Sequence, residues 1–139
     1  IERGHVQSLS DAAWDEQLEV NLSAPFRLTR ALLPAMLEAE RGRILFVSSI
    51  SANLGSPGQA AYHASKAGMV GLMRCLAEEL RETKLVTLAL LPGAIDTDML
   101  RGSPFPARMT AEEVAETLAF YARTPGRGHH GSVVDMLGV

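Results

Sequence analysis

Apolar side chains in the first part of the chain recur at the spacing of a helix. The repeat is formed by Trp14, Leu18, Leu22 and Phe26. Ser10 is placed to cap a helix that starts at Asp11, and the pattern extends to Glu40. Because Pro25 and Pro34 each remove a backbone donor, the pattern predicts a bent helix or two helical pieces.

Two short apolar runs further along the chain are typical of buried strands. Residues 43–49 read Arg-Ile-Leu-Phe-Val-Ser-Ser, and residues 85–91 are almost wholly apolar. An apolar run without polar alternation indicates a parallel strand that is covered on both faces. We expect the first run to deliver Ser48 and Ser49 to an edge of a sheet.

A long helix is predicted between these strands, over residues 59–82. Its apolar face is formed by Met69, Val70, Leu72, Met73, Leu76 and Leu80. Ser56 can cap the helix, with Pro57 in its first turn. We expect Cys75 to be a buried and inert thiol on the apolar side of this helix.

The remaining residues continue the alternation of helix and strand. Thr110 and Glu113 have the spacing of a capping box, which predicts a helix, and residues 132–136 are expected to form a last strand. Residues 98–109 mix apolar side chains with glycine and proline, which indicates a mobile flap or an irregular packed loop. The chain as a whole therefore predicts an α/β fold.

Tyr62 and Lys66 lie one helical turn apart within the long helix. Since positions i and i+4 share a face, the ammonium can approach the phenol and favour its ionised form. A phenol tuned in this way can exchange a proton near neutral pH. The pair alone is a weak signal, because two polar residues at this spacing often form only an exposed face.

Four segments of the chain, in this order, carry a stronger signal: residues 20–26, 42–50, 62–66 and 91–97. In sequence and spacing they resemble the short-chain dehydrogenase/reductases, and the likeness runs from about Ser10 to the C-terminus. The resemblance implies the C-terminal half of a Rossmann-like, doubly wound parallel sheet.

The resemblance also gives each catalytic candidate a role. Tyr62 would exchange a proton with the carbonyl or hydroxyl oxygen of the substrate. Lys66 would favour the ionised phenol and bind the nicotinamide ribose. Ser49, rather than Ser48, would bind the reacting oxygen, and Asn21 would hold a water that links Lys66 to solvent.

NAD or NADP is the cofactor that the resemblance implies. The cofactor-binding candidates are Tyr62, Lys66, Pro92, Gly93, Ile95 and Thr97. The backbone of Ile95 and the hydroxyl of Thr97 would contact the nicotinamide carboxamide. The alternative is an ordinary turn between a strand and a helix, capped by Asp96 or Thr97.

The glycine-rich turn that receives the pyrophosphate in dinucleotide-binding domains does not occur in this sequence. By resemblance, about three βα units would come before the first residue. We therefore expect residues 1–139 to be the C-terminal catalytic half of a single Rossmann-type domain, inactive by itself. The residues that choose between NAD and NADP would lie in the other half.

Ordinary structural roles stay open for several candidates. Ser48 and Ser49 could satisfy backbone groups at a strand end, and Asn21 could mark a kink near Pro25. The leading hypothesis is an NAD(P)-dependent oxidoreductase that interconverts a ketone and a secondary alcohol. The alternatives are a non-catalytic dimerising scaffold and a related dehalogenase or lyase without nicotinamide. By resemblance, such dehalogenases carry arginine where this chain has Lys66.

Composition argues against several other classes. The formal net charge is -3 and the basic residues are scattered, so no basic stripe suited to nucleic acid is present. No apolar run is long enough to span a membrane. The single cysteine excludes an internal disulfide and favours a cytoplasmic location. His129 and His130 are expected in an exposed loop rather than a metal site.

The resemblance implies a small-molecule carbonyl or alcohol as substrate, and a homodimer or homotetramer as assembly. The identity of the substrate cannot be read from these residues.

Overall fold

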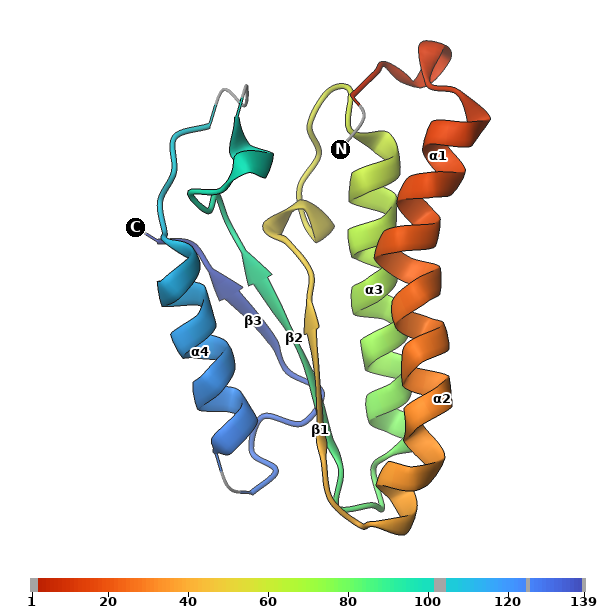
Figure 1. Ribbon diagram of the computed structural model, residues 1–139, viewed down its shortest axis with the longest axis vertical. Coiled ribbons are helices and arrows are strands. Elements are labelled where there is room, and N and C mark those ends of the chain that lie inside the picture. The colour runs from red at the N-terminus through yellow and green to blue at the C-terminus, as the bar shows by residue number, and fades with distance from the viewer. Residues whose placement is uncertain (1–2, 102–104, 125, 139) are drawn as a thin grey trace.

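The computed structural model describes residues 3–101, 105–124 and 126–138. Its helices and strands are α1 (Asp11–Leu18), α2 (Ala24–Glu38), β1 (Arg43–Val47), α3 (Ala60–Glu79), β2 (Val86–Pro92), α4 (Ala111–Arg123) and β3 (Val133–Met136). The strands form a parallel sheet in the order β1-β2-β3. Helices α1, α2 and α3 lie on one side of the sheet and α4 on the other (Figure 1). The predicted α/β fold with a parallel sheet is confirmed.

The central strand β2 is buried along its whole length. Since successive side chains of a strand point to opposite faces, β2 supplies two separate cores. Ala89 and Leu91 pack in the core on the α3 side, and Leu88 and Leu90 pack in the core on the α4 side. The strand predicted over 85–91 is confirmed, displaced by one residue.

Helix α3 covers the sheet with the apolar face that its sequence predicts. The buried residues of this face are Met69, Val70, Met73 and Leu76, continued by Leu80 at the C-cap, and Leu72 is partly buried. The predicted cap at Ser56 is wrong, because the N-cap is Gln59. Gly58 has a φ of 73°, a left-handed conformation that leaves Ser56 and Pro57 in the connection before the helix.

The first helical column combines α1, a π-helical turn at Glu19–Ser23, and α2. Ser10 caps α1, as predicted, and its side chain accepts a hydrogen bond of 3.2 Å from the backbone N–H of Ala13. Pro25 lies in the first turn of α2, directly after the π-helical turn, and removes one backbone donor from the continuous helical column. Pro34 lies inside α2 without ending it. The predicted interruption is thus one wide turn.

The π-helical turn lies very close to α3. A Cβ atom added at Gly68 would lie 2.8 Å from Cδ2 of Leu22, so only glycine permits this approach without a shift of Leu22. The small residue therefore sets how near the two helices come.

Helix α4 begins with the predicted capping box. Oγ1 of Thr110 accepts a hydrogen bond of 3.2 Å from the backbone N–H of Glu113, and the Glu113 carboxylate accepts one of 2.7 Å from the Thr110 N–H. Val114 is buried, and Leu118 and Tyr121 pack on the sheet. These contacts fix α4 on the second face.

Two side chains differ from expectation. Cys75 is exposed, because it lies beside the buried stripe formed by Met73 and Leu76 rather than within it. His130 is half-buried and not part of a plain exposed loop. Its Nδ1 accepts a hydrogen bond of 3.3 Å from the Thr87 N–H, and its Nε2 lies 2.8 Å from the carbonyl oxygen of Ala77.

Among the described residues, no three His, Cys, Asp or Glu side chains are grouped so that they could hold a metal ion. Nor does any helix in these ranges combine the length and apolarity required to cross a bilayer.

Thr110→Ala tests the capping box. We expect the free energy of unfolding to fall by about 1 kcal/mol, since the N–H of Glu113 loses its acceptor. Urea unfolding followed by circular dichroism measures the change, with the exposed mid-helix variant Glu116→Ala as control. Equal stability of the two variants would contradict the role of the cap.

Candidate active site

The candidate residues meet at the carboxyl edge of the sheet. Ser48 and Ser49 follow β1, and Gly93 follows β2. Val47 and Leu90 are register partners in parallel strands, so both strand ends lie at the same edge. In open α/β sheets this is the edge at which ligands bind. Figure 1 shows the first turns of α3 at the same end of the molecule.

Hydrogen bonds tie the Tyr62–Lys66 turn of α3 to the end of β1. Nζ of Lys66 donates to the carbonyl oxygen of Val47 over 3.2 Å. Oγ of Ser48 donates to the carbonyl oxygen of Lys66 over 2.9 Å, and the Ser48 N–H donates to Leu90 O over 2.8 Å. The side chain of Lys66 is therefore held at Val47, two residues before Ser49.

The ammonium of Lys66 also faces the Tyr62 ring. Its Nζ lies 5.7 Å from the ring centroid, within the range of a cation–π contact. Burial lowers the pKa of Lys66 below its ordinary value, because desolvation disfavours the charged form. Within the described residues Lys66 donates one hydrogen bond, so the ammonium has further N–H groups to offer a ligand.

Ser49 is buried, and its side chain makes one hydrogen bond within the described residues. Its Oγ accepts a hydrogen bond of 3.1 Å from the backbone N–H of Ser51 and so caps the short turn Ile50–Ala52. The backbone role considered for this residue is therefore present. A hydroxyl can accept and donate together, and the O–H of Ser49 can still donate to a substrate oxygen. Ser48, by contrast, uses its O–H on Lys66.

Asn21 lies in the π-helical turn and contacts α3 through a serine that the sequence analysis did not single out. Nδ2 of Asn21 donates to Oγ of Ser65 over 3.2 Å, and the Ser65 hydroxyl donates to the carbonyl oxygen of Tyr62 over 2.8 Å. Ser65 is fully buried. Its position three residues after Tyr62, on the inward side of the helix, was the available signal. The water link from Asn21 to Lys66 stays a prediction.

The loop after β2 extends along the same edge. The Gly93 N–H donates to Met136 O over 2.8 Å, and Ile95 forms a parallel bridge with Met109. Thr97 is exposed, and its Oγ1 lies 3.5 Å from Ile95 O. Pro92 is the buried last residue of β2. These four candidates are thus placed beside the strand ends.

The predicted flap over residues 98–109 is described only in part, since 102–104 lie outside the described residues. Met99 and Phe105 are exposed, whereas Met109 is buried. The described part of the segment thus combines two exposed apolar side chains with one, Met109, that is buried.

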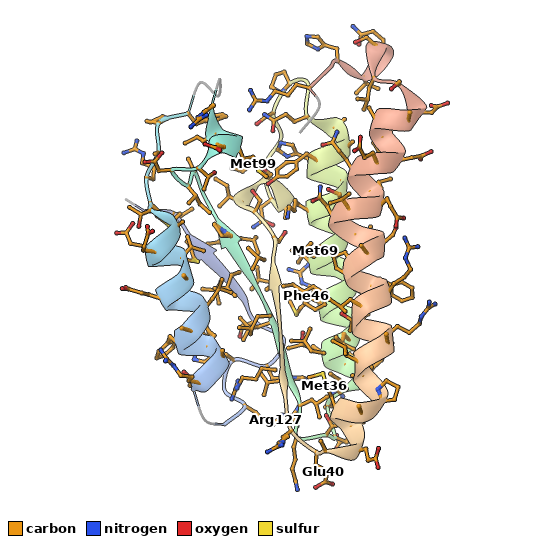
Figure 2. All side chains as sticks on the ribbon, viewed as in Figure 1. Met36, Glu40, Phe46, Met69, Met99 and Arg127 are labelled. Atoms are coloured by element: carbon orange, nitrogen blue, oxygen red, sulfur yellow. The ribbon has the colours of Figure 1, made fainter. Side chains whose placement is uncertain are left out.

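A cleft of about 680 Å³ opens at the opposite edge of the sheet. It is lined by Met36, Glu40, Arg43 and Arg127 among others, and Figure 2 shows the labelled Met36, Glu40 and Arg127 at that end. None of the proton-transfer candidates borders it. Arg43 and Arg127 donate to backbone carbonyl oxygens there, which gives both guanidinium groups a structural role.

The sequence of this chain matches a known protein family. The family model described as short chain dehydrogenase matches residues 1–104, which is more than half of the chain. The chain belongs to the short-chain dehydrogenase family. The matched residues include all four segments on which the resemblance rested, the last of which ends at Thr97.

Curated relatives of this chain include nodulation protein G of Rhizobium sp. strain N33, which is 37% identical over 142 residues. The match covers 94% of this chain and 58% of that protein. The 3-oxoacyl-(acyl-carrier-protein) reductase FabG of Escherichia coli K12 is 35% identical over 126 residues, covering 82% of this chain and 52% of the reductase. The chain therefore spans about half the length of the curated relatives it matches.

Solved structures agree with this placement in the short-chain dehydrogenase family. 4-Hydroxyisoleucine dehydrogenase complexed with NADH superposes with a TM-score of 0.87 at 26% identity, over 99% of this chain and 64% of that one. The 3-oxoacyl-(acyl-carrier protein) reductase of Brucella melitensis ATCC 23457 superposes with a TM-score of 0.88 at 30% identity, over 99% of this chain and 56% of the reductase. The Rossmann-like character of the fold is confirmed.

Ser48→Ala tests the link between α3 and β1. We expect the free energy of unfolding to fall by about 1 kcal/mol, because the carbonyl oxygen of Lys66 loses a buried donor. Urea unfolding of the full-length protein measures the change. Ser51→Ala is the control, since the Ser51 side chain makes no hydrogen bond in the described part of the chain. If the Ser48 variant is as stable as the Ser51 variant, the hydrogen bond from Ser48 does not stabilise the link between α3 and β1.

Proposed function

We propose that residues 1–139 form the C-terminal catalytic half of a single Rossmann-type domain. In this proposal the complete protein is an NAD(P)-dependent oxidoreductase that interconverts a ketone and a secondary alcohol. The observation that carries the proposal is the anchoring of the Tyr62–Lys66 turn to the strand end that bears Ser49. This contact brings a phenol, an ammonium and a hydroxyl to the ligand-binding edge of the sheet.

Tyr62 is the proton donor in the reduction and the proton acceptor in the oxidation. In the reduction its O–H gives a proton to the substrate oxygen, and the positive charge of Lys66 stabilises the phenolate that remains. The O–H of Ser49 donates to the same substrate oxygen and stabilises the negative charge that develops there. In the oxidation the same groups act in reverse.

The nicotinamide cofactor, when bound, supplies or accepts the hydride. The donor set of this chain fits such a group. Lys66 has N–H groups to offer, Thr97 presents an exposed hydroxyl, and both lie at the edge where Pro92 and Gly93 end the central strand. Ile95 offers backbone groups in the same loop. A relative of similar fold was solved with NADH, which supports a nicotinamide dinucleotide here. The proposal leaves NAD or NADP open.

The substrate is proposed only as a class, a small molecule with a ketone or a secondary alcohol. The names of two relatives, 3-oxoacyl-(acyl-carrier-protein) reductase and 4-hydroxyisoleucine dehydrogenase, are consistent with carbonyl and alcohol chemistry in those proteins.

The alternatives have less support. Lys66, where related dehalogenases would carry arginine, argues against a lyase-type reaction without nicotinamide. A dimerising scaffold would need no anchored ammonium, yet Lys66 is held in a partly buried position. In the described residues β1 pairs only with β2, and Val47 on β1 is 40% exposed, which is consistent with a further strand of a longer domain beside it.

Assembly and location remain predictions. A homodimer or homotetramer is supported by large apolar side chains exposed along the first helical column: Trp14, Val20, Phe26, Leu28 and Leu32. A cytoplasmic location is supported by the single cysteine.

Tyr62→Phe in the full-length protein is expected to lower kcat by roughly 100-fold or more, because it deletes the proton donor and little else. Oxidation of NADH or NADPH with a panel of ketones, followed by absorbance, measures turnover. Tyr121→Phe on α4 is the matched control and should keep full activity, since that ring packs on the other face of the sheet. Normal turnover in the Tyr62 variant would exclude the proton-transfer role.

Lys66→Met is expected to weaken cofactor binding and lower kcat together, because one ammonium serves the ribose and the phenol. Titration with NADH and NADPH by fluorescence gives the affinity, and steady-state kinetics give the rate. Lys84→Met removes the other lysine of the chain, which lies in an exposed ion pair with Glu40, and should change neither quantity. If Lys66→Met alters the rate alone, the cofactor-binding role is lost from the proposal.

A further inference from the structure

His63 follows Tyr62 in α3 and makes a contact that the proposed reaction does not use. Its Nδ1 lies 2.6 Å from the carbonyl oxygen of Leu54. Leu54 belongs to the loop 53–58, which leads from the short turn after Ser49 to the start of α3. The other ring nitrogen, Nε2, is buried and has no hydrogen-bond partner among the described residues.

These two facts decide which ring nitrogen of His63 carries the hydrogen. A carbonyl oxygen can only accept a hydrogen bond, so Nδ1 must carry the proton that is donated to Leu54. In the neutral ring Nε2 then holds a lone pair that is sealed from water and unpaired. Because an unpaired buried nitrogen is unfavourable, the bond to Leu54 is the polar contact that keeps the ring in this place.

The ring of His63 also contacts the catalytic tyrosine. The His63 and Tyr62 rings are 6.2 Å apart at their centroids and meet edge to face at 86°. One side chain thus touches the loop on one side and the Tyr62 ring on the other.

Within the described residues, the middle of the loop has few other contacts. A Cβ at Gly55 would meet no atom within 4 Å, and the Leu54 side chain is 61% exposed. Its far end is fixed by the Gly4 N–H, which donates to Gly58 O over 2.9 Å. At its near end the Asn53 N–H donates to Ile50 O over 3.0 Å, and between these two backbone bonds His63 supplies a side-chain anchor at Leu54.

We propose that His63 is a positioning residue. Its Nδ1–H holds the loop 53–58 against the catalytic turn, and that loop forms one wall of the substrate site between Ser49 and Tyr62. His63 touches neither substrate nor cofactor, and its effect passes through the loop. The inference rests on the proposed function, because it assumes that substrate binds at this edge.

The tautomer of His63 tests the contact without any assay of activity. Long-range proton–nitrogen correlation spectra of the full-length protein, labelled with ¹⁵N, report which ring nitrogen carries hydrogen. The signal is assigned by its disappearance in His63→Asn. A hydrogen on Nδ1 supports the proposal. A hydrogen on Nε2 with none on Nδ1 overturns it, since Nδ1 could not then donate to the carbonyl oxygen of Leu54.

Two variants separate positioning from simple packing. The amide nitrogen of asparagine lies as far from Cβ as Nδ1 does, and that of glutamine as far as Nε2 does. We expect His63→Asn to retain KM within about twofold, and His63→Gln to raise KM roughly tenfold with a smaller change in kcat, the size of one lost hydrogen bond. Equal effects of the two variants, or a defect in His63→Asn alone, would overturn the proposal.

Two controls keep the failure of each proposal distinct. Urea unfolding shows that both variants are folded at the assay temperature. If the wild-type protein reduces no carbonyl compound in the panel, the proposed function fails, while the tautomer measurement still decides whether His63 anchors the loop.

Discussion

The candidate site depends on the anchoring of one helical turn to one strand end. The Lys66 ammonium is bonded to Val47, the last residue of β1, and its backbone carbonyl is bonded to Ser48, the residue that follows. This double attachment holds the helix in axial register with the sheet, so Tyr62 and Ser49 keep a fixed relation although 13 residues of chain separate them. A lysine in such a place needs a carbonyl oxygen, because its charge is partly removed from water.

The parallel sheet makes this attachment useful. All three strands end at one edge, and the loops that leave this edge carry Ser49, Gly93, Ile95 and Thr97 while the central strand β2 remains buried. The core on the α3 side and the core on the α4 side hold β2 between them. The candidate site thus combines loops at the strand ends with the first turns of α3, all placed by packing on the same sheet.

Much of this arrangement could be predicted from sequence. The spacing of apolar residues predicted the strands within 43–49 and 85–91 and the apolar face of α3, and the residue types at Thr110 and Glu113 predicted the capping box. These signals are local in sequence. The Ser56 cap failed because Gly58 adopts a left-handed conformation that the preferred cap residues do not reveal. The role of Ser65 and the partial burial of His130 could not be predicted, because their partners, Asn21 in one case and Thr87 with Ala77 in the other, are distant in sequence.

The π-helical turn at Glu19–Ser23 has a consequence for how this chain can vary. Such a turn accommodates one residue more than a regular helix of the same height, and each residue turns a helix by about 100°. Loss of a single residue there would restore a regular α-helix and rotate everything before it around the axis. Asn21 would swing away from Ser65, and the close seat of Leu22 on Gly68 would disappear. A deletion in this helix, unlike one in a surface loop, therefore disturbs the contacts of Asn21 and Leu22 with α3.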